Sequence, residues 1–394
     1  MWKEETTTNH LLRSSRNSKI GRLLFSPFKR LAQGDFDFSL FLVYILFLGI
    51  GVVQVYSSSF IYATEKIGDG LFFFRKQLLF TLVSFTAMLF AMNLPLKFFK
   101  KFALVFWILC SFAVLLVFVP GVGVRVGGAL RWLQLPFGFR LESSEFLKLC
   151  LPMLMAYLMV KNWKELGAWE LPAKAFIVLA PLIVLLKQPD FGSFAISLLM
   201  IGSILFCFGL AYRYIFGAIL SGGALFMALI WFVPYRKARF MAFLDPWSDP
   251  SGSSFQVVQS MLSFYNGGVT GVGLGQGQGK LFFLPEAHTD FTFAVFGEEF
   301  GFVGLVAILC LYGFIVLRGI RISMKSQDYF ARVMCLGLTA YFVFQVSINL
   351  AVDLVLLPTK GLTLPFLSYG GSSLVSMGIL IGLILNVSRY QRRT

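Results

Sequence analysis

Charged residues are scarce in this chain. Asp, Glu, Lys and Arg account for 13% of the 394 residues, whereas 57% are hydrophobic. A soluble globular domain carries about 25% charged residues, so the composition excludes a soluble protein and indicates one that crosses a membrane many times. Cysteine is also rare, and the five that are present have no CxxC spacing. Neither a structural zinc site nor a disulfide framework is indicated.

Nucleotide-binding motifs and internal repeats are absent as well. Seven glycines lie between Gly267 and Gly279, yet the surrounding sequence fails the pattern GxxxxGK[ST], and no GxGxxG follows a predicted strand. Acidic residues are fewer than basic ones, giving a net charge of +15. The basic excess lies mainly in short loops between apolar runs, where it sets membrane orientation. We therefore expect a membrane environment and no nucleic-acid partner.

Long apolar runs are what the chain has in abundance. A transmembrane helix needs about 20 apolar residues, and the runs predict an all-α bundle of about ten such helices in one membrane domain, residues 38–388. A basic tail over residues 1–37 precedes this domain, residues 389–394 follow it, and one large loop, residues 234–290, separates spans seven and eight. The spans are predicted at 38–64, 77–96, 102–124, 149–160, 175–186, 191–212, 214–235, 291–317, 333–352 and 361–388.

The basic residues predict the orientation of this bundle. Most of the 34 Lys and Arg residues fall in the two tails or in loops on the same side as the tails, which places both termini in the cytoplasm and loop 234–290 outside. The first apolar run, from Phe38 to Thr64, is too long for the core of a cleaved signal peptide. We therefore expect a multi-pass protein of the cytoplasmic (inner) membrane.

The segment from Gly267 to Gly301 is polar where most of the chain is apolar. Its glycines allow positive φ or a close approach to a ligand, and Pro285 then breaks the chain. Asp290 follows at the point where the loop re-enters the membrane, and a carboxylate there could act as a general base. It could equally serve as the N-cap of the next helix. The sequence leaves both roles open.

Other acids in this segment could bind a divalent cation such as Mg²⁺ or Mn²⁺. Glu286, His288, Glu298 and Glu299 would supply an oxygen-rich set of ligands, but their spacing matches no strong metal motif. No cofactor is required by the pattern, and a metal ion remains an alternative.

Several cations are predicted on the outer face, against the orientation bias. Each lies beside a polar or proline-rich turn and could bind an anionic headgroup such as a pyrophosphate. Pairing with nearby acids is the alternative, since Glu145 stands three residues before Lys148. The outer cations are Arg131, Lys148, Arg236, Arg239, Lys280 and Lys360.

Two further segments could line a polar cavity. Asn349 and Asp353 lie four residues apart near the outer end of the ninth span, and could instead satisfy broken helix ends. Ser368 belongs to a turn before the last span. Close helix packing is its favoured role, and contact with a ligand is the alternative.

Two stretches of the chain carry a specific resemblance to a known protein family. KLFFLPEAHTDFTFAVFGEEFG, from Lys280 to Gly301, and LPTKGLTLPFLSYGGSS, from Leu357 to Ser373, closely resemble the SEDS family of shape, elongation, division and sporulation proteins. RWL, SEFLKL, QPDFG and YRKARFMAFLDPW extend the match along the chain. PTKGLTLP is similar to the FtsW, or division, branch.

The resemblance implies a fold, an activity and a set of partners. The expected fold has ten spans, and the expected activity is that of a peptidoglycan glycosyltransferase that polymerises lipid II on the outer leaflet and releases undecaprenyl diphosphate. A class B penicillin-binding protein of the FtsI type and divisome proteins are the expected partners at the septum. The family's essential acid falls on Asp290. Glu142 to Glu145 replaces the usual QPSE, and Asp353 to Val355 lacks a glycine often present there.

Two other functions also fit ten spans with polar residues inside them. A transporter that flips lipid II would use the same intramembrane polar groups. A noncatalytic scaffold for divisome proteins would use the basic tail, residues 1–37.

Overall fold

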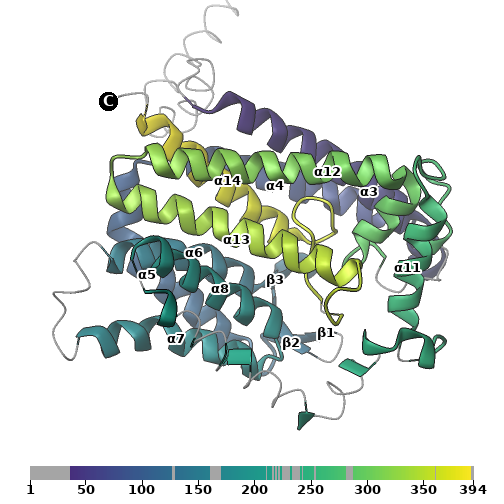
Figure 1. The fold of residues 1–394 in the computed structure, drawn as a ribbon, viewed down its shortest axis with the longest axis horizontal. Coiled ribbons are helices and arrows are strands. Elements are labelled where there is room, and N and C mark those ends of the chain that lie inside the picture. The colour runs from purple at the N-terminus through teal and green to yellow at the C-terminus, as the bar shows by residue number, and fades with distance from the viewer. Residues whose placement is uncertain are drawn as a thin grey trace, which may run out of the picture.

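The structure, a computed structural model, is a bundle of long helices with a small β-sheet packed beside them (Figure 1). It describes residues 36–126, 129–159, 170–209, 211–214, 217, 220, 222–223, 231–232, 240–241, 243–252, 254–280, 287–359 and 361–391. The helices are α3 (Phe38–Ile67), α4 (Phe72–Asn93), α5 (Leu96–Leu116), α6 (Ser143–Leu158), α7 (Glu170–Lys187), α8 (Phe191–Cys207), α11 (Phe255–Gly267), α12 (Thr292–Lys325), α13 (Tyr329–Asp353) and α14 (Gly371–Gln391).

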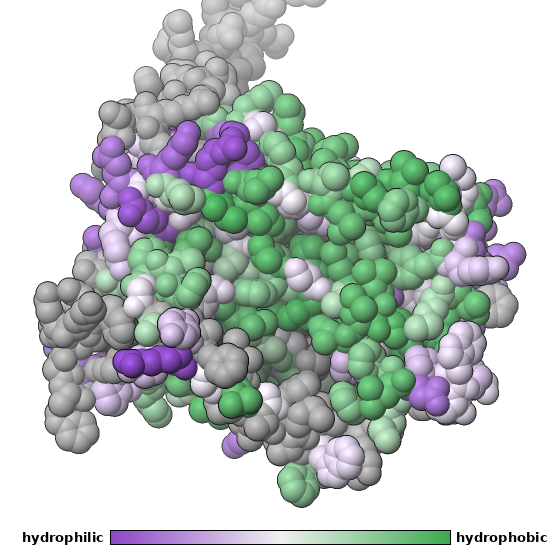
Figure 2. Space-filling model, in the orientation of Figure 1, coloured by the Kyte–Doolittle hydropathy of each residue, from purple (hydrophilic) through white to green (hydrophobic). Residues whose placement is uncertain are grey.

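The predicted fold class, a polytopic helical bundle, is confirmed. Within the described residues six helices, α3, α4, α5, α12, α13 and α14, are long and apolar enough to cross a membrane. Figure 2 shows apolar side chains across the middle of one face, with hydrophilic ones gathered toward its margins. Helices also occupy the shorter predicted spans, while most of span seven lies outside the described residues. The number ten stays a prediction.

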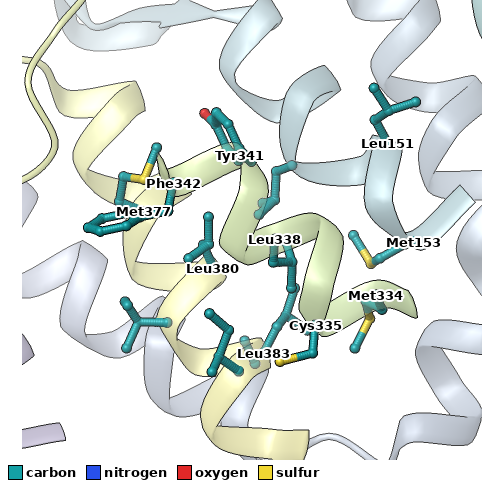
Figure 3. Packing of buried hydrophobic residues seen from close by; sticks show 14 of the residues in the cluster. Leu151, Met153, Met334, Cys335, Leu338, Tyr341, Phe342, Met377, Leu380 and Leu383 are labelled. Atoms are coloured by element: carbon teal, nitrogen blue, oxygen red, sulfur yellow. The ribbon is translucent and has the colours of Figure 1, made fainter. Parts of the chain in front are cut away.

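The centre of the bundle is α13, which packs between α6 and α14 (Figure 3). Met334 and Leu338 of α13 and Leu380 of α14 are fully buried there. Lipid tails are as apolar as these side chains, so close packing rather than water exclusion holds such helices together.

Helices α4 and α14 approach each other closely because of two glycines four residues apart. A Cβ atom on Gly382 would lie 2.4 Å from the carbonyl oxygen of Met88, and one on Gly378 would lie 2.6 Å from that of Ser84. This GxxxG spacing is typical of close helix contacts in membranes.

The chain folds differently from the sequence prediction at the end of the third span and at the start of the last one. The prediction that the third span reaches Val124 is wrong: α5 ends at Leu116, a turn follows, and Gly123–Val126 forms strand β1. Gly121 in that turn has φ of 83°, which favours glycine. Hydropathy alone cannot separate an apolar strand from the end of an apolar helix. The last span likewise begins at Gly371 rather than at Gly361.

Strand β1 belongs to a small antiparallel sheet that the sequence did not predict. It pairs with β2 (Ala129–Gln134), which pairs with β3 (Arg140–Glu142). Trp132 lies opposite Glu142, and α6 begins directly after β3. The sheet therefore connects the end of α5 to the start of α6 and carries Arg131.

The end of the bundle opposite the sheet is joined by polar contacts between distant segments. Asp37, just before α3, accepts a 2.7 Å hydrogen bond from Nε of Arg318, and its backbone N–H donates to Ser388. Arg389 donates to the side-chain oxygen of Asn93. The start of α3 and the ends of α4, α12 and α14 thus lie on one side of the bundle.

Candidate active site

Helix α12 is broken at Gly301, and the glycine-rich loop after α11 fills the break. Gly301 has φ of 63° and ψ of −167°, so the hydrogen bonds of a continuous helix are lost there. The amides of Phe302 and Val303 donate instead to the carbonyls of Gly268 and Val269, at 2.9 and 3.1 Å. Irregular backbone at membrane depth requires such replacement partners. The main role of these glycines is therefore to allow close backbone contact between the loop and α12.

Two buried carboxylates of α12 fix the same loop from the other side. Glu298 accepts hydrogen bonds from the amides of Gln278 and Gly279, at 2.9 and 3.0 Å. Glu299 accepts one from the amide of Gly275 at 3.2 Å. Both glutamates are 1% exposed, so backbone donors take the place of water around them.

Lys280 completes this arrangement as an internal ion pair. Its Nζ atom lies 2.7 Å from Oε1 of Glu299 and 3.1 Å from the hydroxyl of Ser57 on α3. Lys280 is 6% exposed. Lys280, which was predicted to contact a diphosphate, thus lies in a buried ion pair. Pairing with an acid is the alternative that the sequence left open for this set of cations.

The acids considered for a divalent cation do not fit one as they stand. Amide donors bind both oxygens of Glu298. Amide, ammonium and hydroxyl donors bind Oε1 of Glu299, and only its Oε2 has no partner among the described residues. His288 faces aromatic rings, and Glu286 lies outside the described residues. Over the part of the chain that is described, no three His, Cys, Asp or Glu side chains are grouped to hold a metal ion.

Asp290 lies where the start of α12, the end of α13 and the segment before α14 meet. It is half-buried, and a Cβ atom on the exposed Gly361 would lie 3.2 Å from its Oδ2. The side-chain amide of Asn349 donates to the backbone carbonyls of Asp290 and Leu362, at 3.3 and 2.6 Å. The carboxylate thus stands on a fixed backbone beside an exposed glycine.

The N-cap position of α12 is Phe291 rather than Asp290, and Phe291 makes no side-chain capping hydrogen bond. A capping acceptor comes from another helix: Oδ2 of Asp353 accepts from the amide of Phe293 at 3.2 Å. Asp290 was one candidate for the N-cap in the sequence. In the structure the N-cap is the next residue, Phe291, and the capping oxygen belongs to Asp353, 60 positions from the amide that it accepts from.

His288 belongs to an aromatic cluster next to Asp290. Its ring centroid lies 4.8 Å from that of Phe73, 5.3 Å from Tyr62 and 6.1 Å from Tyr369. The amide of Tyr369 donates to the carbonyl of His288 at 2.9 Å, and burial raises the pKa of the Tyr369 phenol to about 12. The cluster ties the segment before α14 to the segment before α12.

Ser368 closes a turn within its own segment. Its hydroxyl accepts a hydrogen bond from the amide of Leu364 at 2.9 Å, and its amide donates to the carbonyl of Leu364 at 3.1 Å. Ser368 is 3% exposed. The close-packing role that the sequence favoured is the one these contacts describe.

Lys148 lies inside the bundle in a network with three other polar groups. Its Nζ atom is 2.8 Å from Oε1 of Glu145 and 2.9 Å from Oε1 of Gln345, and the hydroxyl of Tyr341 donates to Oε2 of Glu145 at 2.7 Å. All four side chains are at most 2% exposed. The pairing of Lys148 with Glu145 is realised, and it fixes α6 to α13.

Arg131 is more exposed than Lys148 and Lys280, with 20% of its side chain accessible. It donates to the carbonyls of Gln188 and Pro189 and lies 3.8 Å from Oδ1 of Asp190. Burial raises the pKa of Asp190, but the positive charges of Arg131 and Lys148 outweigh this and hold that pKa below its usual value.

Glu142 is the acid in this area that resists ionisation. Burial, together with the negative charges of Glu145 and Asp190, raises its pKa to about 8, because a carboxylate loses hydration there and gains like-charged neighbours. Its amide donates to the hydroxyl of Ser372 at 2.9 Å, which joins the sheet to α14.

Comparison with known proteins places this site in a family. The sequence profile of the family described as "Cell cycle protein", which covers FtsW, RodA and SpoVE, matches residues 37–393. The chain belongs to this family. It is 39% identical to the "Probable peptidoglycan glycosyltransferase FtsW" of Geobacter metallireducens, covering 91% of this chain and 96% of that protein. It is 37% identical to "Stage V sporulation protein E" of Bacillus subtilis, covering 90% and 98%.

Solved structures of the FtsW/RodA/SpoVE family share the fold. The rod shape determining protein RodA of Thermus thermophilus is 25% identical, with a TM-score of 0.67 over 90% of this chain and 97% of that one. A chain from a structure described as "Structural coordination of polymerization and crosslinking by a peptidoglycan synthase complex" is 28% identical, with a TM-score of 0.74 over 90% and 98%. The resemblance to SEDS proteins is confirmed.

In this FtsW/RodA/SpoVE protein the predicted site residues are not all brought together: Arg131 lies on the small sheet, Lys148 on α6 and Ser368 in the turn before α14. Asp290 and His288 lie together at the outer junction, and Lys280 and Glu298 lie at the break of α12. Sequence reasoning missed Tyr341 and Gln345, whose four-residue spacing with Asn349 and Asp353 was a readable signal. The remaining predicted residues Arg236, Arg239, Glu286 and Lys360 lie outside the described residues.

Proposed function

We propose that this chain is a septal peptidoglycan glycosyltransferase that polymerises lipid II with Asp290 as general base. Family membership supports the activity, because the FtsW relatives at 39% identity are named peptidoglycan glycosyltransferases over nearly the whole of both chains. The half-buried Asp290, beside the exposed Gly361 at the outer end of the bundle, is the observation that carries the assignment of the base.

The reaction is a displacement at an anomeric carbon. The 4-hydroxyl of the GlcNAc of an incoming lipid II attacks the MurNAc anomeric carbon of the growing chain while Asp290 accepts the hydroxyl proton. The bond to undecaprenyl diphosphate breaks, and the diphosphate leaves with the electron pair. A diphosphate needs no protonation to depart, so a second catalytic carboxyl is not required, unlike in glycoside hydrolysis.

The cations Arg131, Lys148 and Lys280 are proposed to offset the charge of the lipid diphosphate. Arg131 is the one best placed for direct contact, because Lys148 and Lys280 are buried in pairs with Glu145 and Glu299. A positive charge aimed at a developing anion stabilises the transition state. The buried lysines would act without direct contact. Their positive charges offset those of Glu145 and Glu299 and so make the electrostatic potential at the diphosphate less negative.

The proposed setting is the cytoplasmic membrane at the division septum, with both termini in the cytoplasm. A class B penicillin-binding protein of the FtsI type is the proposed partner, supported by the structural neighbour from a complex that couples polymerisation and crosslinking. Divisome proteins would recruit the pair.

Purified protein in detergent tests the function directly. Wild type is expected to polymerise lipid II in the presence of moenomycin, which a flippase without glycosyltransferase activity would not do. Asp290→Asn keeps the shape but removes the basic oxygen, so polymerisation is expected to fall on the order of a hundredfold or more at unchanged thermal stability. Asp290→Glu is also expected to have low polymerase activity, because its longer side chain moves the carboxylate oxygen out of alignment with the reacting hydroxyl. Substantial activity in Asp290→Asn would remove Asp290 from the role of base.

A further inference from the structure

Asp353 is a buried carboxylate at the outer end of a polar ridge on α13. Tyr341, Gln345, Asn349 and Asp353 follow each other at four-residue spacing, and all four are at most 1% exposed. The first two bind the Glu145 and Lys148 network. The last two reach the segment that carries Asp290.

The other two residues of this ridge, Asn349 and Asp353, hold the backbone at Asp290 and three residues after it. Asn349 donates to the carbonyl of Asp290 at 3.3 Å. Asp353 accepts from the amide of Phe293, three residues further on, at 3.2 Å. Between these two contacts the chain turns from a loop into the first turn of α12, so α13 defines where that turn begins.

The start of α12 needs an acceptor from elsewhere. The first amides of any helix lack partners within the helix, and the N-cap residue here, Phe291, has no side chain that could accept a hydrogen bond. A carboxylate near a helix N-terminus also interacts favourably with the helix dipole. Asp353, fully buried, pairs with no cation among the described residues, and burying such a group is costly unless it is hydrogen-bonded. Its Oδ2 meets this need through the amide of Phe293, while its Oδ1 has no hydrogen-bond partner among the described residues.

We propose that Asp353 is a positioning residue, which fixes the first turn of α12 and thereby the carboxylate of Asp290 relative to the reacting hydroxyl. The inference rests on the proposed role of Asp290 as general base. A displacement of about 1 Å at a reacting group can cost a hundredfold in rate. Loss of the hydrogen bond should therefore lower turnover while leaving the binding of lipid II nearly intact.

The test compares near-isosteric variants in the purified full-length protein with lipid II as substrate. Asp353→Asn keeps an oxygen that accepts the Phe293 amide, and Asp353→Leu does not. We expect kcat of Asp353→Leu to fall roughly 10- to 100-fold with less than about a threefold change in KM, and Asp353→Asn to stay within about threefold of wild type, since Asn and Asp cap helices almost equally well. Asp353→Thr and Asp353→Val form a second pair with the same contrast if Asp353→Leu does not fold.

Ser260→Ala is the matched control. Its hydroxyl donates to the backbone carbonyl of Asp353 at 2.6 Å, so removing it disturbs the same helix end without touching the carboxylate, and kcat should change little. Wild-type kcat in Asp353→Leu, or a loss in Asp353→Asn equal to that in Asp353→Leu, would overturn the positioning role. Activity retained in Asp290→Asn would instead overturn the proposed base, so the two failures are distinguishable.

Discussion

The start of α12 and its break, about ten residues apart, use acidic residues in opposite ways. At the break, Glu298 and Glu299 are buried, and backbone amides, Lys280 and Ser57 bind their oxygens. At the start, Asp290 is half-buried beside an exposed glycine, and other residues hold its backbone. The comparison teaches that acids close together in the sequence can differ in exposure. Internal donors bind the acids at the break, whereas the acid at the start of α12 keeps part of its surface accessible.

The largest effect is expected when the buried pair at the break is split. Lys280→Met leaves Glu299 charged and buried without its ammonium partner, which should lower the free energy of unfolding by about 3 to 5 kcal/mol. Thermal melting in detergent measures this loss. The double variant Lys280→Met with Glu299→Met should recover most of it, whereas Asp290→Asn should melt near wild type. An unchanged melting point in Lys280→Met would contradict the stabilising role of the Lys280–Glu299 pair at the break of α12.

A smaller effect is expected at Arg131, whose partly exposed side chain is the proposed direct contact to the lipid diphosphate. Arg131→Met should weaken lipid II binding by about 1.5 to 3 kcal/mol, the usual cost of removing a hydrogen bond to a charged group. Binding of lipid II to the purified protein measures it. Lys148→Met is the matched comparison: if it weakens binding more than Arg131→Met at equal stability, the buried lysine is the main diphosphate contact and exposure is the wrong criterion.

The next effect depends on pH and concerns Glu142. Its pKa of about 8 exceeds the ordinary value of 4.5, so the folded protein holds this proton while the unfolded chain releases it. Stability from this group is complete below about pH 4.5 and is lost as pH rises toward 8. Glu142→Gln has no proton to lose. Its melting temperature relative to wild type should therefore rise between pH 5 and 8, and a constant difference would contradict the raised pKa.

The smallest expected effect is a gain in stability at Val355. The resemblance implies a glycine within Asp353 to Val355 that this sequence lacks, and Val355 has φ of 58°. The amides of Leu356 and Val355 donate to the carbonyls of Ala351 and Val352, which is the Schellman ending of a helix that favours glycine. Val355→Gly should raise the free energy of unfolding by about 1 kcal/mol, since a β-branched residue is strained at positive φ. A lower melting point in Val355→Gly would contradict this.

The sequence by itself determined the membrane class, the family and the polar segment around Asp290. Hydropathy reveals spans because a membrane helix must satisfy its backbone internally, and the motifs from Lys280 to Gly301 and from Leu357 to Ser373 are specific. The sequence also predicted a helix contact between Glu145 and Lys148, since their spacing is local.

Only the tertiary structure decided which polar residues serve the fold and which face the outside. Ser57 and Glu299 are 242 residues apart, and Asp353 lies 60 residues from the amide that it caps. No local periodicity reports such pairs, because they arise where separate helices happen to cross. The small sheet, the break at Gly301 and the cap of α12 were hidden for the same reason: each depends on which distant backbone donor or acceptor arrives to replace a missing local partner.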